Sequence, residues 1–232
     1  MRRVITIFIF LISWLVTVPA QNPVHHTIGE TELSGVDIYS LFWDDNEDLL
    51  YAATNNGVFV RRQNRFIPLN LVGEHVGSSY FHLQQTNGRI FCSNLNGQLF
   101  EVNGLNLEII FQIGIEEHWS SFNYMIAGQD LIAYTNKKVW RIHEDGEIEV
   151  VLDDSLMVSL EFDPNKSGLL EAVSYGDSLI FPIQFTSDYL SYDIQAQQFK
   201  RIVTNLPLAY DHDYIIYSQI AGELVGLSLI HI

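Results

Sequence analysis

The sequence predicts an all-β fold, an incomplete (open) β-propeller of about five four-stranded units. Three observations support this prediction: a recurring apolar segment, Asn- and Gly-rich turns between short apolar strands, and the absence of any apolar stripe at helical spacing after residue 20. Equivalent positions of the recurring segment are separated by 40, 41, 49 and 35 residues. These positions are Leu50, Ile90, Leu131, Ile180 and Ile215.

Each unit repeats one order of strands and turns. The segment Arg89–Leu99 has the same pattern of apolar and polar residues as Leu49–Phe59. In the second unit, turns are predicted between strands at Thr86–Gly88 and Asn96–Gly97. Asn-Gly favours tight hairpins because both residues adopt positive φ at little cost. A meander of about 40 residues is the size of a propeller blade, whose faces are buried only against neighbouring blades. A β-sandwich, the competing architecture, has no reason to repeat at this period.

The first twenty residues predict a secretory signal peptide. Arg2 and Arg3 precede an apolar run from Val4 to Val18, and the small residue Ala20 suits cleavage. The alternative is an uncleaved membrane anchor, but this run is shorter than the roughly 20 residues that span a bilayer. We therefore expect an exported protein.

The remaining chain is divided by the repeats. Residues 21–35 form a lead-in segment, residues 36–226 form the partial propeller, and residues 227–232 are a candidate non-native tail. The tail resembles a translated sequencing adapter. The chain stops abruptly after about five units, without a closing strand, so we expect it to be a fragment. A small complete propeller is the alternative.

The composition restricts the partners and the redox chemistry. The chain has 28 acidic and 12 Lys or Arg residues, a net charge of −16. That charge repels phosphate backbones and anionic lipids, so we expect no nucleic-acid partner. Cys92 is the one cysteine, so no intramolecular disulfide can form, and its apolar neighbours predict a buried small side chain.

Three groups of residues resemble metal or acid–base sites. Asp44–Asp48 offers carboxylates suited to calcium, but it lacks the glycine and the distal glutamate of a calcium loop, so we interpret it as a hairpin turn. His25-His26 and Asp211–Asp213 could supply ligands or a proton-transfer pair. No second cluster completes either site, and we expect structural or surface roles.

No pattern of a catalytic site is present. A Gly-x-Ser-x-Gly elbow and a phosphate-binding Gly-x-x-x-x-Gly-Lys-Ser loop are both missing. Paired carboxylates for glycoside cleavage meet only in space, and Asp153-Asp154, Glu116-Glu117 and Asp163 are ordinary turn residues by sequence. We therefore expect no catalytic, cofactor-binding or metal-binding residues, and no cofactor.

Aromatic residues make up 12% of the chain, and they could either stack on sugars or fill the spaces between sheets. We expect core packing for Trp43, Trp119 and Trp140. Asn165-Lys166-Ser167 fits an N-glycosylation acceptor, but only in a eukaryotic secretory pathway. Its neighbours Asp163 and Gly168 indicate a turn.

The first unit resembles the two-component regulator propeller repeat. The matching stretches are Ile38–Leu41, Asp45–Asp48 and Leu50–Val58, although Asp48 stands where glycine is usual and Tyr51 replaces a tryptophan. The stronger match covers about residues 26–102. The resemblance implies the periplasmic sensor region of a Bacteroidetes-type sensor histidine kinase, followed in a full-length relative by a membrane span and a kinase. It also implies a location in the periplasm or on the outer face of a bacterial cell envelope, and a closed ring of seven or more blades, which is more than the about five units found here.

The leading expectation is therefore an extracytoplasmic ligand-sensing region of a two-component histidine kinase, without catalysis of its own. Its partner would be an extracellular ligand, with glycans among the candidates, and the full-length protein would be membrane-anchored and dimeric. One alternative is a secreted propeller enzyme or carbohydrate-binding protein acting on glycans. Another is a repeat protein that makes only protein contacts.

Overall fold

The computed structural model describes 31–73, 79–114, 122–204, 214–220 and 223–229, with side chains to residue 204. The chain divides into two units, Met1–Ser34 and Gly35–Ile232. Residues 31–34 of the first unit form a turn. The predicted signal peptide lies outside the described residues, as does most of the predicted lead-in.

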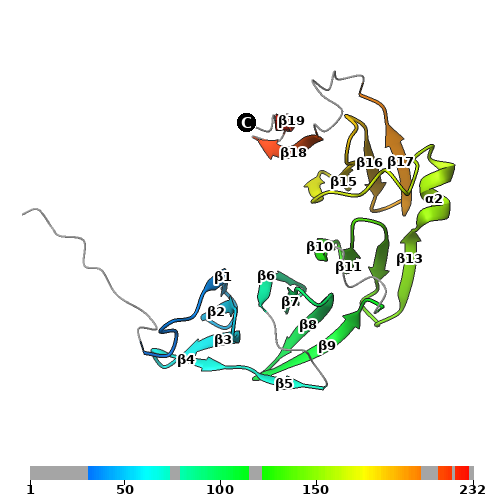
Figure 1. Ribbon diagram of the computed structural model, residues 1–232. Coiled ribbons are helices and arrows are strands. Elements are labelled where there is room, and N and C mark those ends of the chain that lie inside the picture. Colours follow the sequence, from blue (N-terminus) through cyan, green and yellow to red (C-terminus); the bar gives the residue numbers. More distant parts are fainter. Residues whose placement is uncertain (1–30, 74–78, 115–121, 205–213, 221–222, 230–232) are drawn as a thin grey trace, which may run out of the picture. The chain divides into compact units, whose positions relative to one another are not determined.

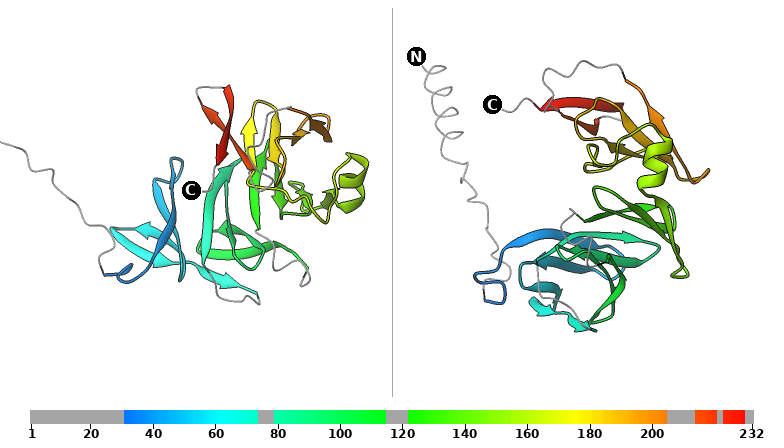
Figure 2. Two further views of the ribbon diagram at one scale, coloured as in Figure 1. Left: turned by 45° about the horizontal axis from the view of Figure 1, so that its top comes forward. Right: turned by 45° about the vertical axis from the view of Figure 1, so that its right-hand side comes forward.

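Antiparallel sheets follow one another in chain order through the second unit (Figure 1; Figure 2). Three sheets have four strands each, arranged in sequence order. The first contains β1 (Ile38–Asp44), β2 (Leu49–Thr54), β3 (Gly57–Arg62) and β4 (Arg65–Pro68). The third contains β10 (Asn123–Ala127), β11 (Asp130–Tyr134), β12 (Val139–Ile142) and β13 (Ile148–Leu152). The fourth contains β14 (Val173–Tyr175), β15 (Ser178–Pro182), β16 (Tyr189–Asp193) and β17 (Gln198–Ile202).

The second and last sheets depart from four strands. The second contains β6 (Tyr80–Thr86), β7 (Arg89–Asn94), β8 (Gln98–Asn103), β9 (Asn106–Gln112) and an added strand, β5 (Asn70–Val72). Strand β5 pairs in parallel with β9, so the chain that leaves the first sheet is hydrogen-bonded to the outer strand of the second. The last sheet is the hairpin of β18 (Tyr214–Ile220) and β19 (Glu223–Leu229), which runs into the predicted tail.

Turn chemistry explains why the strands meander. Asn87 and Gly88 join β6 to β7 with φ of 50° and 76°, the positive values that a two-residue type I′ turn requires. Gly97 also has positive φ, and a Cβ built there would lie 2.2 Å from the side chain of Ile113. The predicted Asn-Gly turns are confirmed at both places.

Apolar clusters lie between successive sheets, and β11 shows how they arise. Successive side chains of a strand point to opposite faces. Leu131 and Ala133 belong to the cluster shared with the second sheet, whereas Ile132 and Tyr134 belong to the cluster shared with the fourth. All five residues of β11 are buried, so the third sheet contributes to two cores.

The first sheet has one covered and one uncovered face. Phe42 packs in the cluster with the second sheet, and Asp44 accepts a hydrogen bond from Gln85 Nε2 at 3.0 Å. The alternating residues Leu41 and Trp43 point the other way and are 59% and 46% exposed. The predicted core role is therefore wrong for Trp43, because among the described residues no sheet covers this face. It is confirmed for Trp140, which is buried.

Two simpler expectations are confirmed. Cys92 is fully buried in the cluster between the first two sheets, and burial raises the pKa of its thiol. Helix content is low: within the described part, the one α-helix is α2 (Asp154–Ser159). No helix in that part is long and apolar enough to cross a membrane.

A buried tyrosine joins the second and third sheets. The hydroxyl of Tyr124 on β10 donates to the carbonyl oxygen of Phe91 at 2.8 Å and also contacts the carbonyl of His82. His82 lies at an irregularity in β6 and has a positive φ of 54°. A polar group buried between sheets is costly without a partner, so this hydroxyl holds the irregular strand in place.

We predict that Tyr124→Phe destabilises the chain by about 1–3 kcal/mol, because two buried carbonyl groups lose their donor. The measurement is the free energy of unfolding from urea titration. Tyr39→Phe is the control, since Tyr39 is partly exposed on β1. Equal stability of the two variants would contradict the role given to Tyr124.

Candidate functional site

The longest repeat contains an insertion. Leu131 and Ile180 are 49 residues apart, whereas the preceding spacings are 40 and 41. The additional residues lie between β13 and β14, where the chain forms α2 and then a turn at 163–167. Insertions in repeat proteins form loops on one face, which is often the binding face.

Local capping explains why this segment forms a helix. Asp153 has extended backbone angles, and its carboxylate accepts hydrogen bonds from the Ser155 hydroxyl at 2.7 Å and from the Leu156 N–H at 3.0 Å. These bonds lower the pKa of Asp153. Met157 is buried in the core between the third and fourth sheets, and this contact attaches the helix to the sheets.

A pocket of about 560 Å³ lies between the insertion and the β15–β16 loop. The first wall comes from the insertion, and the second comes from the loop and the end of β17. The lining residues are Glu161, Phe162, Asp163, Asn165, Lys166, Ser167, Gln184, Phe185, Thr186 and Arg201.

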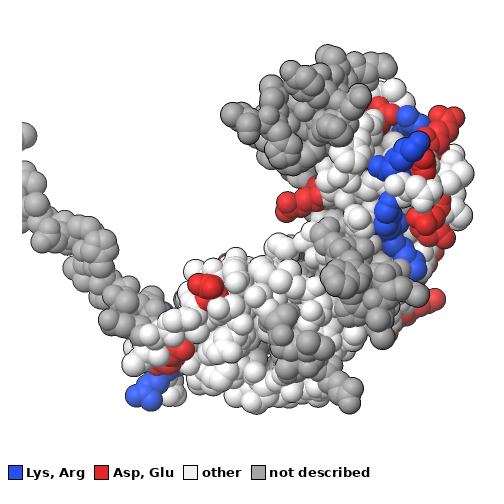
Figure 3. Space-filling model, in the orientation of Figure 1, with Lys and Arg blue, Asp and Glu red and all other residues white. Residues whose placement is uncertain are grey.

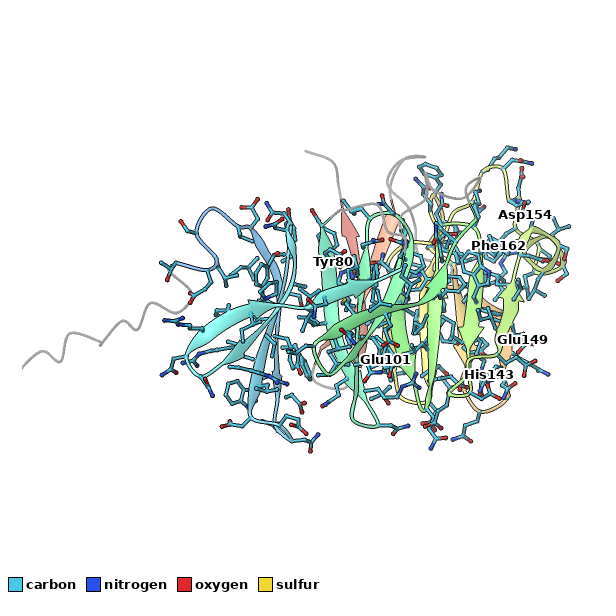
Figure 4. All side chains as sticks on the ribbon, turned by 90° about the horizontal axis from the view of Figure 1, so that it is seen from below. Tyr80, Glu101, His143, Glu149, Asp154 and Phe162 are labelled. Atoms are coloured by element: carbon cyan, nitrogen blue, oxygen red, sulfur yellow. The ribbon has the colours of Figure 1, made fainter. Side chains whose placement is uncertain are left out.

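Strand order explains why these distant segments meet. Neighbouring strands in the third and fourth sheets are antiparallel, so alternate connections emerge at the same edge. The β13–β14 and β15–β16 connections share one edge, and the β12–β13 turn lies at the other. Figure 4 shows Phe162 and Asp154 at one edge and His143 at the opposite edge.

Arg201 joins the two walls. Its Nε and Nη2 donate to Oδ2 of Asp188 at 2.9 and 2.7 Å. Its Nη1 donates to the carbonyl oxygen of Glu161 at 3.1 Å, and the guanidinium carbon lies 4.5 Å from the ring centre of Phe162. One side chain of the fourth sheet therefore contacts both the loop and the insertion.

Both walls contain a strained residue. Glu161 and Phe185 each have φ of 63°, a left-handed conformation that side chains other than glycine rarely adopt. Such strain persists only where surrounding contacts maintain it, and it is concentrated at functional sites. Arg201 supplies part of that support at Glu161.

The pocket combines aromatic and polar groups. Phe162 is buried, whereas Phe185 is 45% exposed and can contact a ligand with its ring. Gln184, Asn165 and Thr186 supply amide and hydroxyl groups. This lining suits a small ligand with hydroxyl groups and an apolar face.

A second hollow of about 440 Å³ lies at the opposite edge. It contains Asp130, His143 and three further acidic residues, Glu144, Asp145 and Glu147. Asp130 accepts from Arg141 Nε at 2.6 Å, and His143 Nδ1 lies 3.5 Å from its Oδ2. Because Asp130 is already paired, we assign this hollow a structural role.

The hairpin turn predicted at Asp44–Asp48 is confirmed, since these residues connect β1 to β2. Asp44 is buried at the end of β1, and its carboxylate accepts from Asn46 N–H at 3.0 Å. In the described ranges no three His, Cys, Asp or Glu residues are placed to hold a metal ion.

Of the other sequence candidates, Asp153 caps α2, Asp154 lies in its first turn and Asp163 lines the pocket. The turn predicted at Asn165–Ser167 is confirmed, since Asp163 Oδ1 accepts from the Asn165 N–H at 3.0 Å. The remaining candidates lie outside the described residues: His25, His26, Glu116, Glu117, Trp119 and 211–213.

Sequence reasoning missed Arg201, Asp188, Gln184 and Phe185. None of them lies in a recognisable motif. The signal that could have indicated the pocket was the spacing of 49 residues, which marks the insertion.

Comparison with known proteins identifies the fold. No family model and no curated protein matches the chain. Among solved structures, the extracellular domain of the putative one component system BT4673 from B. thetaiotaomicron matches 82% of the chain with 13% identity and a TM-score of 0.56. The corresponding domain of the putative hybrid two component system BT3049 matches 82% with 14% identity and a TM-score of 0.54. The chain covers 27% and 28% of these structures, respectively.

A third structure extends the comparison to a different group of proteins. The C-terminal WD40 domain of Sif2 matches 77% of the chain, with 12% identity, a TM-score of 0.50 and 62% of its own length covered. The described part of Gly35–Ile232 is an open β-propeller. Its sheets are blades, and the pocket lies between the β13–β14 insertion and the fourth blade. The predicted fold class, and the resemblance to two-component sensor propellers at the level of fold, are confirmed.

The capping of α2 by Asp153 predicts that the stability of the fold depends on pH. The lowered pKa of Asp153 means that its carboxylate stabilises the folded propeller above the ordinary carboxyl value of 3.8. This contribution is lost as the pH falls through the lowered pKa. We predict that Asp153→Ala costs about 0.5–2 kcal/mol at pH 7 and progressively less below about pH 4. Urea unfolding across pH tests this, with Asp154→Ala as the control; a pH-independent difference would contradict it.

The ion pair between Arg201 and Asp188 predicts that the two walls of the pocket open locally when the pair is removed. In Asp188→Ala, the guanidinium of Arg201 loses its buried partner, so segments 160–167 and 184–188 should exchange amide hydrogens at least about tenfold faster. Hydrogen-exchange mass spectrometry measures this. Glu144→Ala, which removes the same charge at the opposite edge, should leave both segments unchanged. Uniformly faster exchange in all blades would indicate global destabilisation instead.

Proposed function

We propose that this chain is the extracytoplasmic ligand-sensing region of a two-component signalling protein. The observation that supports this most is the likeness to two extracellular domains of bacterial one- or two-component systems over 82% of the chain. The N-terminal sequence supports export, because Arg2, Arg3 and the following apolar run have the order of a secretory signal. The histidine kinase, the membrane anchor and the dimer belong to this proposal for the full-length protein.

The proposed ligand is a glycan, and its proposed site is the pocket between the β13–β14 insertion and the fourth blade. The half-exposed ring of Phe185 can stack on the apolar face of a sugar, and Gln184 and Asn165 can hydrogen-bond its hydroxyl groups. A volume of about 560 Å³ accommodates one or two sugar rings.

Binding is favoured over cleavage of the glycan. A glycosidase needs one carboxylic acid that keeps its proton until it reaches the leaving group. In this pocket the pKa of Asp163 is lowered, mainly because its carboxylate accepts the backbone N–H of Asn165. That carboxylate is therefore ionised near neutral pH. Release of reducing ends from oligosaccharides by the purified chain would instead favour the secreted-enzyme alternative.

The test is a binding screen of mono- and oligosaccharides by calorimetry, followed by mutation of the pocket. Phe185→Ala should weaken the tightest-binding sugar about three- to tenfold, the loss expected for one aromatic contact. Position 185 has a left-handed backbone, which alanine adopts about as reluctantly as phenylalanine does, so the substitution mainly removes the ring. Trp43→Ala, at an equally exposed aromatic of the first blade, should bind as the wild type does. Binding by none of the sugars would contradict the glycan proposal.

A further inference from the structure

One half of the Arg201 guanidinium is held by a buried carboxylate. Nε and Nη2 donate to Oδ2 of Asp188, which is only 6% exposed, and Oδ1 of Asp188 accepts from the Thr204 N–H at 3.3 Å. Charge-assisted hydrogen bonds shielded from water are strong and directional. Arg201 is therefore held in one orientation before any ligand arrives.

The other half faces the pocket and has a weak partner. Nη1 donates to the carbonyl oxygens of Leu160 and Glu161 at 3.4 and 3.1 Å, and to Oε2 of Glu161 at 3.3 Å. The side chain of Glu161 is 87% exposed. Ion pairs this exposed contribute little, because water and salt screen them and a long side chain must be ordered. The Glu161 carboxylate is thus the exchangeable partner of Arg201.

A second cation borders the same pocket. Lys166 is 83% exposed and lies 3.4 Å from Oδ2 of Asp163, a pairing as weakly shielded as that of Glu161. Figure 3 shows Lys and Arg side chains gathered beside Asp and Glu around α2 and the fourth blade. For a chain with a net charge of −16, this is a place where an anionic group meets positive charge.

We infer that the pocket binds a carboxylate of its ligand, which replaces the Glu161 side chain on Nη1 of Arg201. The group displaced is itself a carboxylate, so the donor already has the position and direction that such a ligand needs. Together with the Phe185 ring, this selects a sugar acid, a uronate, over a neutral sugar. The inference rests on the proposed function, because it specifies the chemistry of that same site.

Calorimetric titration of the full chain with D-glucuronate, D-glucose and acetate tests this inference. Glucuronate should bind at least about tenfold more tightly than glucose, because glucose lacks the charged partner for Arg201. Its affinity should fall as salt is added, because screening weakens the exposed charge pair. Acetate should bind weakly, since it has no ring to contact Phe185.

Variants separate the role of each partner. Glu161→Gln removes the competing carboxylate and should tighten glucuronate binding up to about fivefold, while Arg201→Gln should weaken it at least about tenfold. Glu144→Gln, which removes one negative charge at the opposite edge, should bind as the wild type does. Because Glu161 is exposed, its variant tests the inference even if Arg201→Gln fails to fold.

The outcomes distinguish the two levels of the proposal. Equal binding of glucose and glucuronate, or unchanged glucuronate binding in Glu161→Gln, overturns the carboxylate inference and leaves a neutral-glycan site. Equal binding of acetate and glucuronate overturns the selection of a sugar acid. Binding of none of these compounds, nor of the sugars in the wider screen, overturns both the inference and the glycan ligand.

Discussion

The structure depends on one constraint: the sheet of a propeller blade can bury its two faces only against the neighbouring blades. Strand β11 satisfies it on both sides, with Leu131 in one core and Ile132 in the next. The same constraint explains the apolar repeats at 40 and 41 residues, because each blade must supply equivalent side chains to two interfaces. On the first blade only one face is covered within the described chain, so Leu41 and Trp43 remain exposed.

Two tyrosine hydroxyls buried at these interfaces are paired across blades. The Tyr124 hydroxyl donates to a carbonyl of the second blade, and the Tyr134 hydroxyl accepts the Ala172 N–H of the fourth at 2.9 Å. Ala172 lies just before β14, outside the strand ladder, so the Tyr134 hydroxyl supplies the acceptor for its N–H. The packing between blades therefore includes directional hydrogen bonds as well as apolar contacts.

The pocket uses this scaffold without being part of its core. Lys137 of the third blade donates to the Ser167 carbonyl at 2.9 Å, while Arg201 of the fourth blade holds Glu161 and Asp188. A ligand in the pocket therefore contacts groups anchored in two blades. In the proposed sensing role, ligand binding would therefore stabilise one arrangement of these groups over another.

Sequence alone determined the strand order and the turns, since apolar alternation and Asn-Gly pairs such as Asn87-Gly88 act locally. It also marked an insertion through the spacing of 49 residues. Only the tertiary structure decided that the insertion meets Arg201, 39 positions after Phe162, because strand reversal brings alternate connections to one edge. Likewise Trp43 is exposed and Trp140 buried: the residue type is the same, and burial depends on whether a neighbouring blade covers it.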